Sequence, residues 1–129
     1  MNLVIDTSAV VACLTGEAER LAFVDLIQTS RQRQMTAVNL LEARLVLTFT
    51  KGLPSTVVDD FIADYGVDII PFDEPLSDLA FEAYGRYGKG RHPARLNMGD
   101  CVAYALAKAR GWPLLYKGDD FSETDVERA

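Results

Sequence analysis

The sequence predicts an α/β fold of three layers, in which helices cover both faces of a central parallel sheet. Short apolar segments of strand type alternate with longer segments of helical periodicity along the whole chain. The apolar fraction of 49% and the charged fraction of 25% are typical of a globular protein. At 129 residues the chain has the length of one ordinary domain, which we expect to span residues 1–129.

The composition narrows the classes of function. Because the formal net charge is −6, binding of a polyanion needs a local basic patch or bound metal. Cys13 and Cys101 lie in apolar helical patterns, without the spacing of a zinc site or disulfide framework. No apolar segment approaches the roughly 20 residues of a membrane span, and no secretory signal precedes the first strand. We therefore expect a cytoplasmic protein without membrane contact.

The first half of the chain contains two predicted strands and three predicted helices. The apolar segment that ends at Asp6 predicts a buried strand. Helical spacing follows over residues 9–14 and 17–30, and a short strand is expected at 35–37. A longer helix is expected over 38–50, because Gly52 and Pro54 lie directly beyond it.

The second half continues the alternation. Ser55 is the expected cap of a helix that ends near Tyr65, and residues 67–71 predict a buried strand. Amphipathic spacing predicts a helix over 74–87. A nearly continuous apolar pattern predicts a buried helix over 99–109, followed by a last strand at 113–116. This alternation is typical of a parallel sheet.

Asp6, Thr7 and Ser8 form the first candidate site, because they follow directly after the first strand. Ligands of open parallel sheets bind beyond the carboxyl ends of the strands, where loops and helix N-termini leave polar groups free. The same three residue types are also good helix caps. For Asp6 alone, the sequence leaves both roles open.

Glu42 is the second candidate, because it interrupts an apolar pattern. Helical spacing aligns it with a stripe that we expect to face the core, made up of Val38, Leu41, Leu45 and Phe49. An unpaired carboxylate is costly to bury. Glu42 is therefore expected to pair with an arginine such as Arg44 or Arg95, to be protonated, or to bind a cation.

Three more acids lie where they can join Asp6 and Glu42. Asp100 opens the buried helix, and Asp119 and Asp120 follow the last strand; in isolation each is better explained as a cap or turn residue. Strand carboxyl ends and the N-termini of the following helices share one sheet edge, so these acids can converge in one cleft. Oxygen ligands without histidine or thiolate favour Mg²⁺ or Mn²⁺ over zinc, and they support metal-assisted phosphodiester cleavage.

A glycine-rich segment, residues 85–97, is the one concentrated cationic stretch of this acidic chain. Its basic side chains are Arg86, Lys89, Arg91, His92 and Arg95. A flexible cationic loop is suited to phosphate contacts, and the alternative is a solvated surface loop. His92 is not expected to be a general base, because a lone histidine beside a proline is more often structural or a phosphate contact.

Four motifs carry a family resemblance. They are IDTSAVVA from Ile5, NLLEA around Glu42, GRHPARLNMGDCVAYALAKARG around Asp100, and LLYKGDDF from Leu114. Each is weak alone, but together they occur in order over residues 6–121 and resemble the PIN-domain ribonucleases, specifically the VapC-like toxins of bacterial toxin–antitoxin pairs. The resemblance implies a compact α/β fold and Mg²⁺- or Mn²⁺-dependent endonucleolytic cleavage of single-stranded or looped RNA, such as tRNA or rRNA loops, which inhibits translation.

The resemblance also implies roles for individual residues. The family's acid quartet falls on Asp6, Glu42, Asp100 and one acid of the 118–121 turn, where Asp119 is favoured and Asp120 is held in reserve. We expect the first three acids to hold Mg²⁺. Thr7 and Ser8 are expected to orient Asp6 or a metal-bound water. The RNA backbone is expected to contact Arg86, Lys89, Arg91 and Arg95.

The family resemblance implies protein partners as well. These are a cognate VapB-like antitoxin, whose C-terminal segment wraps the toxin and often places an arginine in the acidic site, and a second copy of the chain in a homodimer.

Two alternative functions differ from a toxin ribonuclease. A first alternative is a non-catalytic module whose acidic groove receives a basic peptide. A second is a receiver-like phosphoacceptor domain, based on Asp6 and Lys117, but it lacks an acceptor aspartate after a middle strand and leaves Glu42 unexplained.

Overall fold

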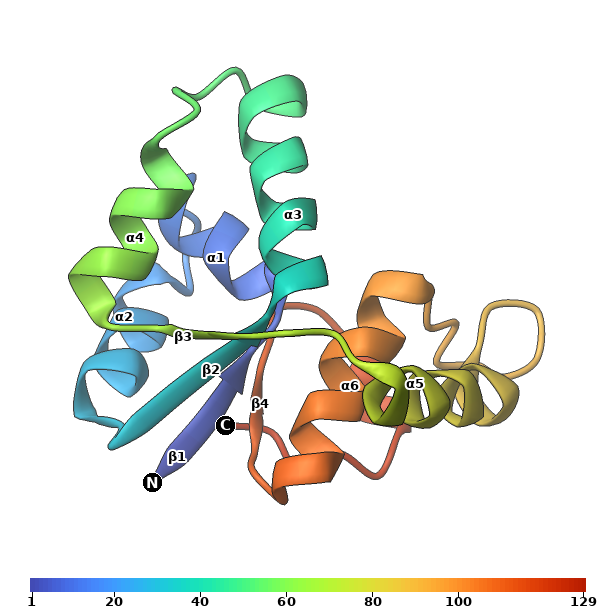
Figure 1. Cartoon of the computed structure of the whole chain (residues 1–129). Coiled ribbons are helices and arrows are strands. Elements are labelled where there is room, and N and C mark those ends of the chain that lie inside the picture. Colours follow the sequence, from blue (N-terminus) through green and yellow to red (C-terminus); the bar gives the residue numbers. More distant parts are fainter.

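Four parallel strands form the centre of the computed structural model, which describes residues 1–129 (Figure 1). The strands are β1 (Asn2–Ile5), β2 (Gln32–Thr36), β3 (Asp68–Ile70) and β4 (Leu114–Leu115). Their order across the sheet is β3-β2-β1-β4, and every pairing is parallel. β1 is therefore an inner strand, and its carboxyl end lies in the middle of one sheet edge.

Helices form a layer on each side of the sheet (Figure 1). One layer contains α1 (Thr7–Leu14), α2 (Arg20–Thr29), α3 (Ala37–Leu45) with its π-helical continuation η1 (Val46–Thr50), and α4 (Val57–Tyr65). The other contains α5 (Glu74–Tyr87) and α6 (Met98–Arg110), and a 3₁₀ helix, η2 (Asp120–Glu123), follows β4. None of the helices combines the length and the apolar character needed to cross a membrane.

The two layers bury hydrophobic clusters of similar size, with 16 and 15 buried residues. Leu3 and Ile5 of β1 belong to the cluster under α1–α4, whereas Val4 belongs to the cluster under α5 and α6. This alternation is that of a strand with both faces covered. The predicted α/β fold with helices on both faces of a parallel sheet is confirmed.

Three expectations about individual elements are wrong. β3 is an edge strand with Asp68 exposed, so it is not buried. Ser55 is not the cap of α4, because Thr56 holds that position and makes no side-chain cap. β2 begins at Gln32 rather than at Met35, because the backbone of residues 32–34 pairs with β1 although their side chains are polar.

The largest departure concerns α3 and η1. The stripe expected to face the core faces solvent, with Leu41 54%, Leu45 48% and Phe49 81% exposed. The core contacts come from a different face of the same helix, from Asn39, Ala43 and Leu47. Both faces have helical spacing, so periodicity alone does not distinguish them. Only the position of the sheet selects the face that is buried.

Candidate active site

Asp6 lies at the carboxyl end of β1 and is the N-cap of α1. Its Oδ2 accepts hydrogen bonds from the backbone N–H of Ser8 at 3.0 Å and from the Ser8 hydroxyl at 2.6 Å. Its Oδ1 is buried and has no hydrogen-bond partner. Asp6 thus caps a helix with one oxygen and leaves the other unsatisfied, which is costly unless a cation or proton compensates.

The pKa of Asp6 reports the same imbalance. Burial raises this pKa from 3.8 to about 7, because its effect is larger than that of the two hydrogen bonds from Ser8, which lower the pKa. The charges of Asp100 and Glu42 raise it further. Three acids from three different elements therefore repel one another, and a bound cation relieves such repulsion.

Asp100 lies in the first turn of α6. It forms a reciprocal capping box with Asn97: Asp100 Oδ2 accepts from the Asn97 N–H at 3.1 Å, and Asn97 Oδ1 accepts from the Asp100 N–H at 2.9 Å. Burial raises the pKa of Asp100 to about 6, and the charges of Asp120 and Glu42 add to the rise. Asp100 is therefore both a cap and a member of the acidic group.

The carboxylate of Glu42 lies against the backbone of Gly99. A Cβ atom on Gly99 would overlap Glu42 Oε2, so a larger residue at position 99 would displace the Glu42 carboxylate from this place. The expected arginine partner is absent, because Arg44 pairs with Asp59 at 2.5 Å and no salt bridge of the chain includes Glu42 or Arg95. Glu42 is half-buried beside Asp100 and does not lie in a core-facing stripe.

The turn after β4 brings Asp120 toward the other acids. Asp120 opens η2, and its charge contributes to the raised pKa of Asp100, whereas Asp119 makes no such contribution. The backbone N–H of Lys117, just before this turn, donates to Ser8 Oγ at 3.0 Å. Ser8 therefore connects Asp6 to the segment that carries Asp120.

Thr7 contacts a different element from Ser8. Its hydroxyl donates to the backbone carbonyl of Asn39 at 3.2 Å, and so joins α1 to α3. Sequence reasoning missed Asn39 and Thr36, which are fully buried and hydrogen-bonded to each other beneath the acids. The available signal was an amide inside the apolar segment AVNLL.

The basic segment forms a closed loop between α5 and α6. Backbone hydrogen bonds from Leu96 N–H to Tyr87 and from Lys89 N–H to Leu96 join its two ends. Lys89, Arg91 and Arg95 are exposed, and none of them takes part in a salt bridge. The loop thus presents three free cations just before the helix that carries Asp100.

Arg86 and His92 do not join these cations. Arg86 lies in the last turn of α5, donates to the Tyr87 hydroxyl at 2.9 Å and stacks over the Tyr87 ring. His92 Nδ1 accepts from the Ala94 N–H at 3.0 Å, and the His92 ring packs edge-on against Tyr87. Both side chains therefore stabilise the base of the loop.

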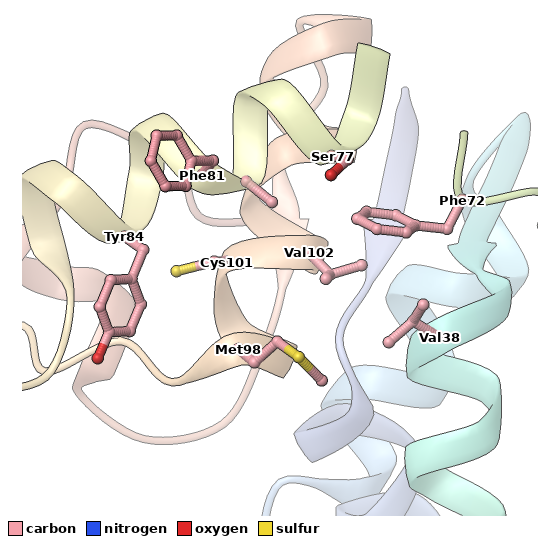
Figure 2. Close-up of a pocket in the computed structure, with 9 residues that line it drawn as sticks. Val38, Phe72, Ser77, Phe81, Tyr84, Met98, Cys101 and Val102 are labelled. Atoms are coloured by element: carbon pink, nitrogen blue, oxygen red, sulfur yellow. The ribbon is translucent and has the colours of Figure 1, made fainter. Parts of the chain in front are cut away.

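A mostly apolar cavity of about 390 Å³ lies between α5, α6 and the start of α3 (Figure 2). Figure 2 shows Met98 extending from the start of α6 toward Val38 on α3. None of the lining residues is charged. A smaller hollow shares Val38 and Met98 with this cavity and includes Glu42 and Gly99. The apolar surface therefore continues as far as the acids.

The chemistry of the acids fits a hard divalent cation. Asp6, Glu42, Asp100 and Asp120 offer only carboxylate oxygens, which are ligands suited to Mg²⁺ or Mn²⁺. Oδ1 of Asp6 is buried without a hydrogen-bond partner, and ligation of such an ion would satisfy this oxygen. No three Asp, Glu, His or Cys side chains are grouped closely enough to form a complete metal site. The site is thus a set of converging acids, not a preformed cage.

Comparisons with known proteins identify the family. The sequence matches the PIN domain over residues 3–127. Ribonuclease VapC42 of Mycobacterium tuberculosis is 38% identical over 130 residues, which cover 98% of each chain. Ribonuclease VapC30 of the same organism is 42% identical over 125 residues, covering 96% of this chain and 95% of that protein.

Solved structures have the same fold. The toxin VapC20 of Mycobacterium tuberculosis, described as cleaving the Sarcin-Ricin loop, matches with a TM-score of 0.78 at 17% identity over 98% of both chains. VapBC2 from Rickettsia felis, crystallised with a DNA fragment from its promoter, matches with a TM-score of 0.72 at 12% identity, covering 100% of this chain and 98% of that chain. At these identities the likeness shows the fold.

The chain belongs to the PIN-domain family, whose match covers nearly all of the sheet and its helices. Its relatives over nearly the full length place it among the VapC ribonucleases. This class consists of toxin endoribonucleases that depend on a divalent metal ion.

Proposed function

We propose that this chain is the endoribonuclease toxin of a toxin–antitoxin pair, and that it uses Mg²⁺ held by Asp6, Glu42 and Asp100. One observation carries the proposal: Asp6 Oδ1 is buried without a partner, and burial together with neighbouring carboxylates raises the pKa values of Asp6 and Asp100. When bound, the ion activates water and stabilises the leaving oxygen of the scissile phosphodiester. The positive charge of the ion also offsets the charge of the acids, so that a polyanionic substrate can approach the site.

Each acid has a distinct role in this proposal. Ser8 fixes Oδ2 of Asp6, so that Oδ1 remains available as a ligand. Asp100 is held by its capping box, which limits the rotation of its carboxylate. We assign the fourth acid to Asp120 in place of Asp119, because Asp120 is the acid of the turn whose charge acts on Asp100.

The RNA backbone is assigned to the loop between α5 and α6. Lys89, Arg91 and Arg95 are exposed and unpaired, as phosphate ligands need to be. Arg86 is left out of this set because Tyr87 already engages its guanidinium. The proposed substrate class is a loop of structured RNA, such as a tRNA or rRNA loop. The single-stranded backbone of a loop can bind to a small cationic surface, whereas an RNA duplex needs a longer surface along its grooves.

Two protein partners are proposed for two different surfaces. The acidic edge suits a basic segment of a VapB-like antitoxin by charge complementarity. The apolar cavity beside it suits a second copy of this chain, because two proteins of net charge −6 meet with least repulsion on a face without charges. The exposed side chains on or near this face are Leu41, Leu45, Phe81, Tyr84 and Met98.

The proposal is tested by cleavage of total cellular RNA with purified, antitoxin-free protein in Mg²⁺, Mn²⁺ or EDTA. We expect metal-dependent fragments that disappear in Asp6→Asn and Asp100→Asn and persist in Asp119→Asn, the matched control. Asp120→Asn is expected to lose more activity than Asp119→Asn. Native-level cleavage by folded Asp6→Asn or Asp100→Asn would contradict the assignment. No cleavage of any RNA by folded native protein would favour the non-catalytic module with an acidic groove.

A further inference from the structure

A pair of buried polar side chains, Thr36 and Asn39, lies beneath the acidic edge. Both are 0% exposed. The Thr36 hydroxyl donates to Asn39 Oδ1 at 2.6 Å and accepts from the Asn39 N–H at 3.0 Å. The second bond is an ordinary N-cap of α3, and it needs no amide side chain at position 39.

The amide of Asn39 is used to bind a different helix. Its Nδ2 donates to the backbone carbonyl of Gly99 at 3.0 Å, although the two residues are 60 positions apart. The backbone carbonyl of Asn39 also accepts from the Thr7 hydroxyl. Asn39 therefore contacts both α6 and the start of α1.

Each of these contacts adjoins one of the acids. Thr7 directly follows Asp6, and Gly99 directly precedes Asp100. Glu42 is one helical turn beyond Asn39, and its carboxylate lies against Gly99. The three elements that carry the acids thus meet at one buried residue.

Burial makes this arrangement rigid. An amide without its partner is costly to bury, so displacement of α6 from α3 would leave Asn39 Nδ2 unpaired. Since the Glu42 carboxylate already touches Gly99, the same displacement changes the spacing between Glu42 and Asp100. The hydrogen bond therefore controls a spacing on which joint ligation of an ion depends.

We propose that Asn39 is a positioning residue, whose buried amide holds α6 against α3 so that Asp6, Glu42 and Asp100 bind one divalent ion together. This inference rests on the proposed function, because it assumes that these acids bind a divalent ion. It adds a residue that makes no contact with the ion or the RNA. It also explains an amide in an apolar segment, where an aliphatic side chain would suffice for packing.

The experiment measures Mn²⁺ binding by isothermal titration calorimetry, without RNA, for the native chain, Asn39→Ala and Thr36→Val. Ser30→Ala is the matched control. Ser30 is also buried, its hydroxyl donates to the Ile27 carbonyl at 2.7 Å, and it accepts from Arg33 Nε at 3.1 Å. Ser30 lies just before β2, at the sheet edge opposite the acids.

Asn39→Ala is expected to raise the Kd for Mn²⁺ by about tenfold, the lower range for loss of an outer hydrogen bond to a metal site. Ser30→Ala is expected to lower the melting temperature while leaving this Kd unchanged. Thr36→Val also removes the N-cap of α3, which is expected to lower the melting temperature. Its effect on the Kd is expected to be smaller than that of Asn39→Ala and to add nothing in the double variant, because the Thr36 hydroxyl reaches the acids through the Asn39 amide.

Native Kd values in both Asn39→Ala and Thr36→Val would overturn the inference and leave the proposed function in place. An equal rise in Ser30→Ala would also overturn it, since general destabilisation would then explain the effect. If Asn39→Ala does not fold, Thr36→Val decides alone: a raised Kd supports the inference and an unchanged Kd overturns it. Absence of Mn²⁺ binding by the native chain, with Asp6→Asn indistinguishable from it, would overturn the proposed function together with this inference.

Discussion

The helix formed by α3 and η1 has two faces of helical spacing, and they meet very different surroundings. The inner face, with Ala43 and Leu47, is fully buried in the hydrophobic cluster between its helical layer and the sheet. The outer face, with Leu41, Leu45 and Phe49, is exposed. Exposed apolar groups gathered in this way indicate a surface that a partner covers. An apolar stripe thus predicts burial without saying whether the core or a partner provides it.

The strongest test of this difference is the removal of one side chain from each face. Leu47→Ala is expected to lower the free energy of unfolding by about 2–5 kcal/mol, because it leaves a cavity in the core. Phe49→Ala is expected to change it by no more than about 0.5 kcal/mol, because its ring is already in water. Urea unfolding measures both values. Equal losses in the two variants would mean that the faces are equivalent.

Glu42 lies on the acidic edge beside the outer face, and its substitution separates function from stability. Glu42→Gln keeps the shape of the side chain but removes a charge that repels Asp6 and Asp100. We expect the initial rate of RNA cleavage to fall by about 100-fold, without loss of unfolding free energy. Glu82→Gln, an exposed glutamate of α5, is the control and should cleave at the native rate. A comparable loss of cleavage rate in Glu82→Gln would contradict a specific role for Glu42 in the acidic site.

The same acids predict how the stability of the metal-free protein depends on pH. The pKa of Asp6 rises to about 7 and that of Asp100 to about 6 on folding, so the folded state binds more protons than the unfolded state above their usual pKa of 3.8. The stability that these groups contribute is therefore complete below pH 3.8 and is lost as the pH rises toward 7.

The measurement is urea unfolding in EDTA at about pH 5 and about pH 7.5, where the native chain is expected to be less stable at the higher pH by on the order of 2 kcal/mol. Asp6→Asn removes the group with the larger rise in pKa, so the stability of this variant should change less between the two pH values. Addition of Mn²⁺ at the higher pH should restore stability to the native chain. A native chain that gains stability as pH rises would contradict the raised pKa values.

The smallest effect is expected from a charge placed on the outer face. Leu45→Lys should weaken self-association by about tenfold, equivalent to about 1.4 kcal/mol, because it places a cation in a surface proposed to be covered. Sedimentation equilibrium measures the change. Leu21→Lys, at an exposed leucine of α2, is the control and should associate like the native chain. If neither variant differs from the native chain, the second copy does not bind at this face.

Much of the acidic site could be predicted from the sequence because its signals are local. Asp6 and Asp100 follow a strand and open a helix, and such boundaries are encoded by neighbouring residues. The helical spacing predicts that Glu42 faces the core, which is wrong because its stripe is exposed; the structure nevertheless places Glu42 beside Asp100. The preference between Asp119 and Asp120 depends on the path of one turn, which no local pattern specifies.

The sequence by itself determined the alternation of strands and helices and the edge at which the acids gather. These follow from residue spacing and from the geometry of parallel sheets. Only the tertiary structure decided which face of α3 is buried, which loop cations are free, and which side chain joins the acid-bearing elements. Asn39 is the clearest case, because its partner Gly99 is 60 residues away. A contact over that distance exists only once the helices have packed.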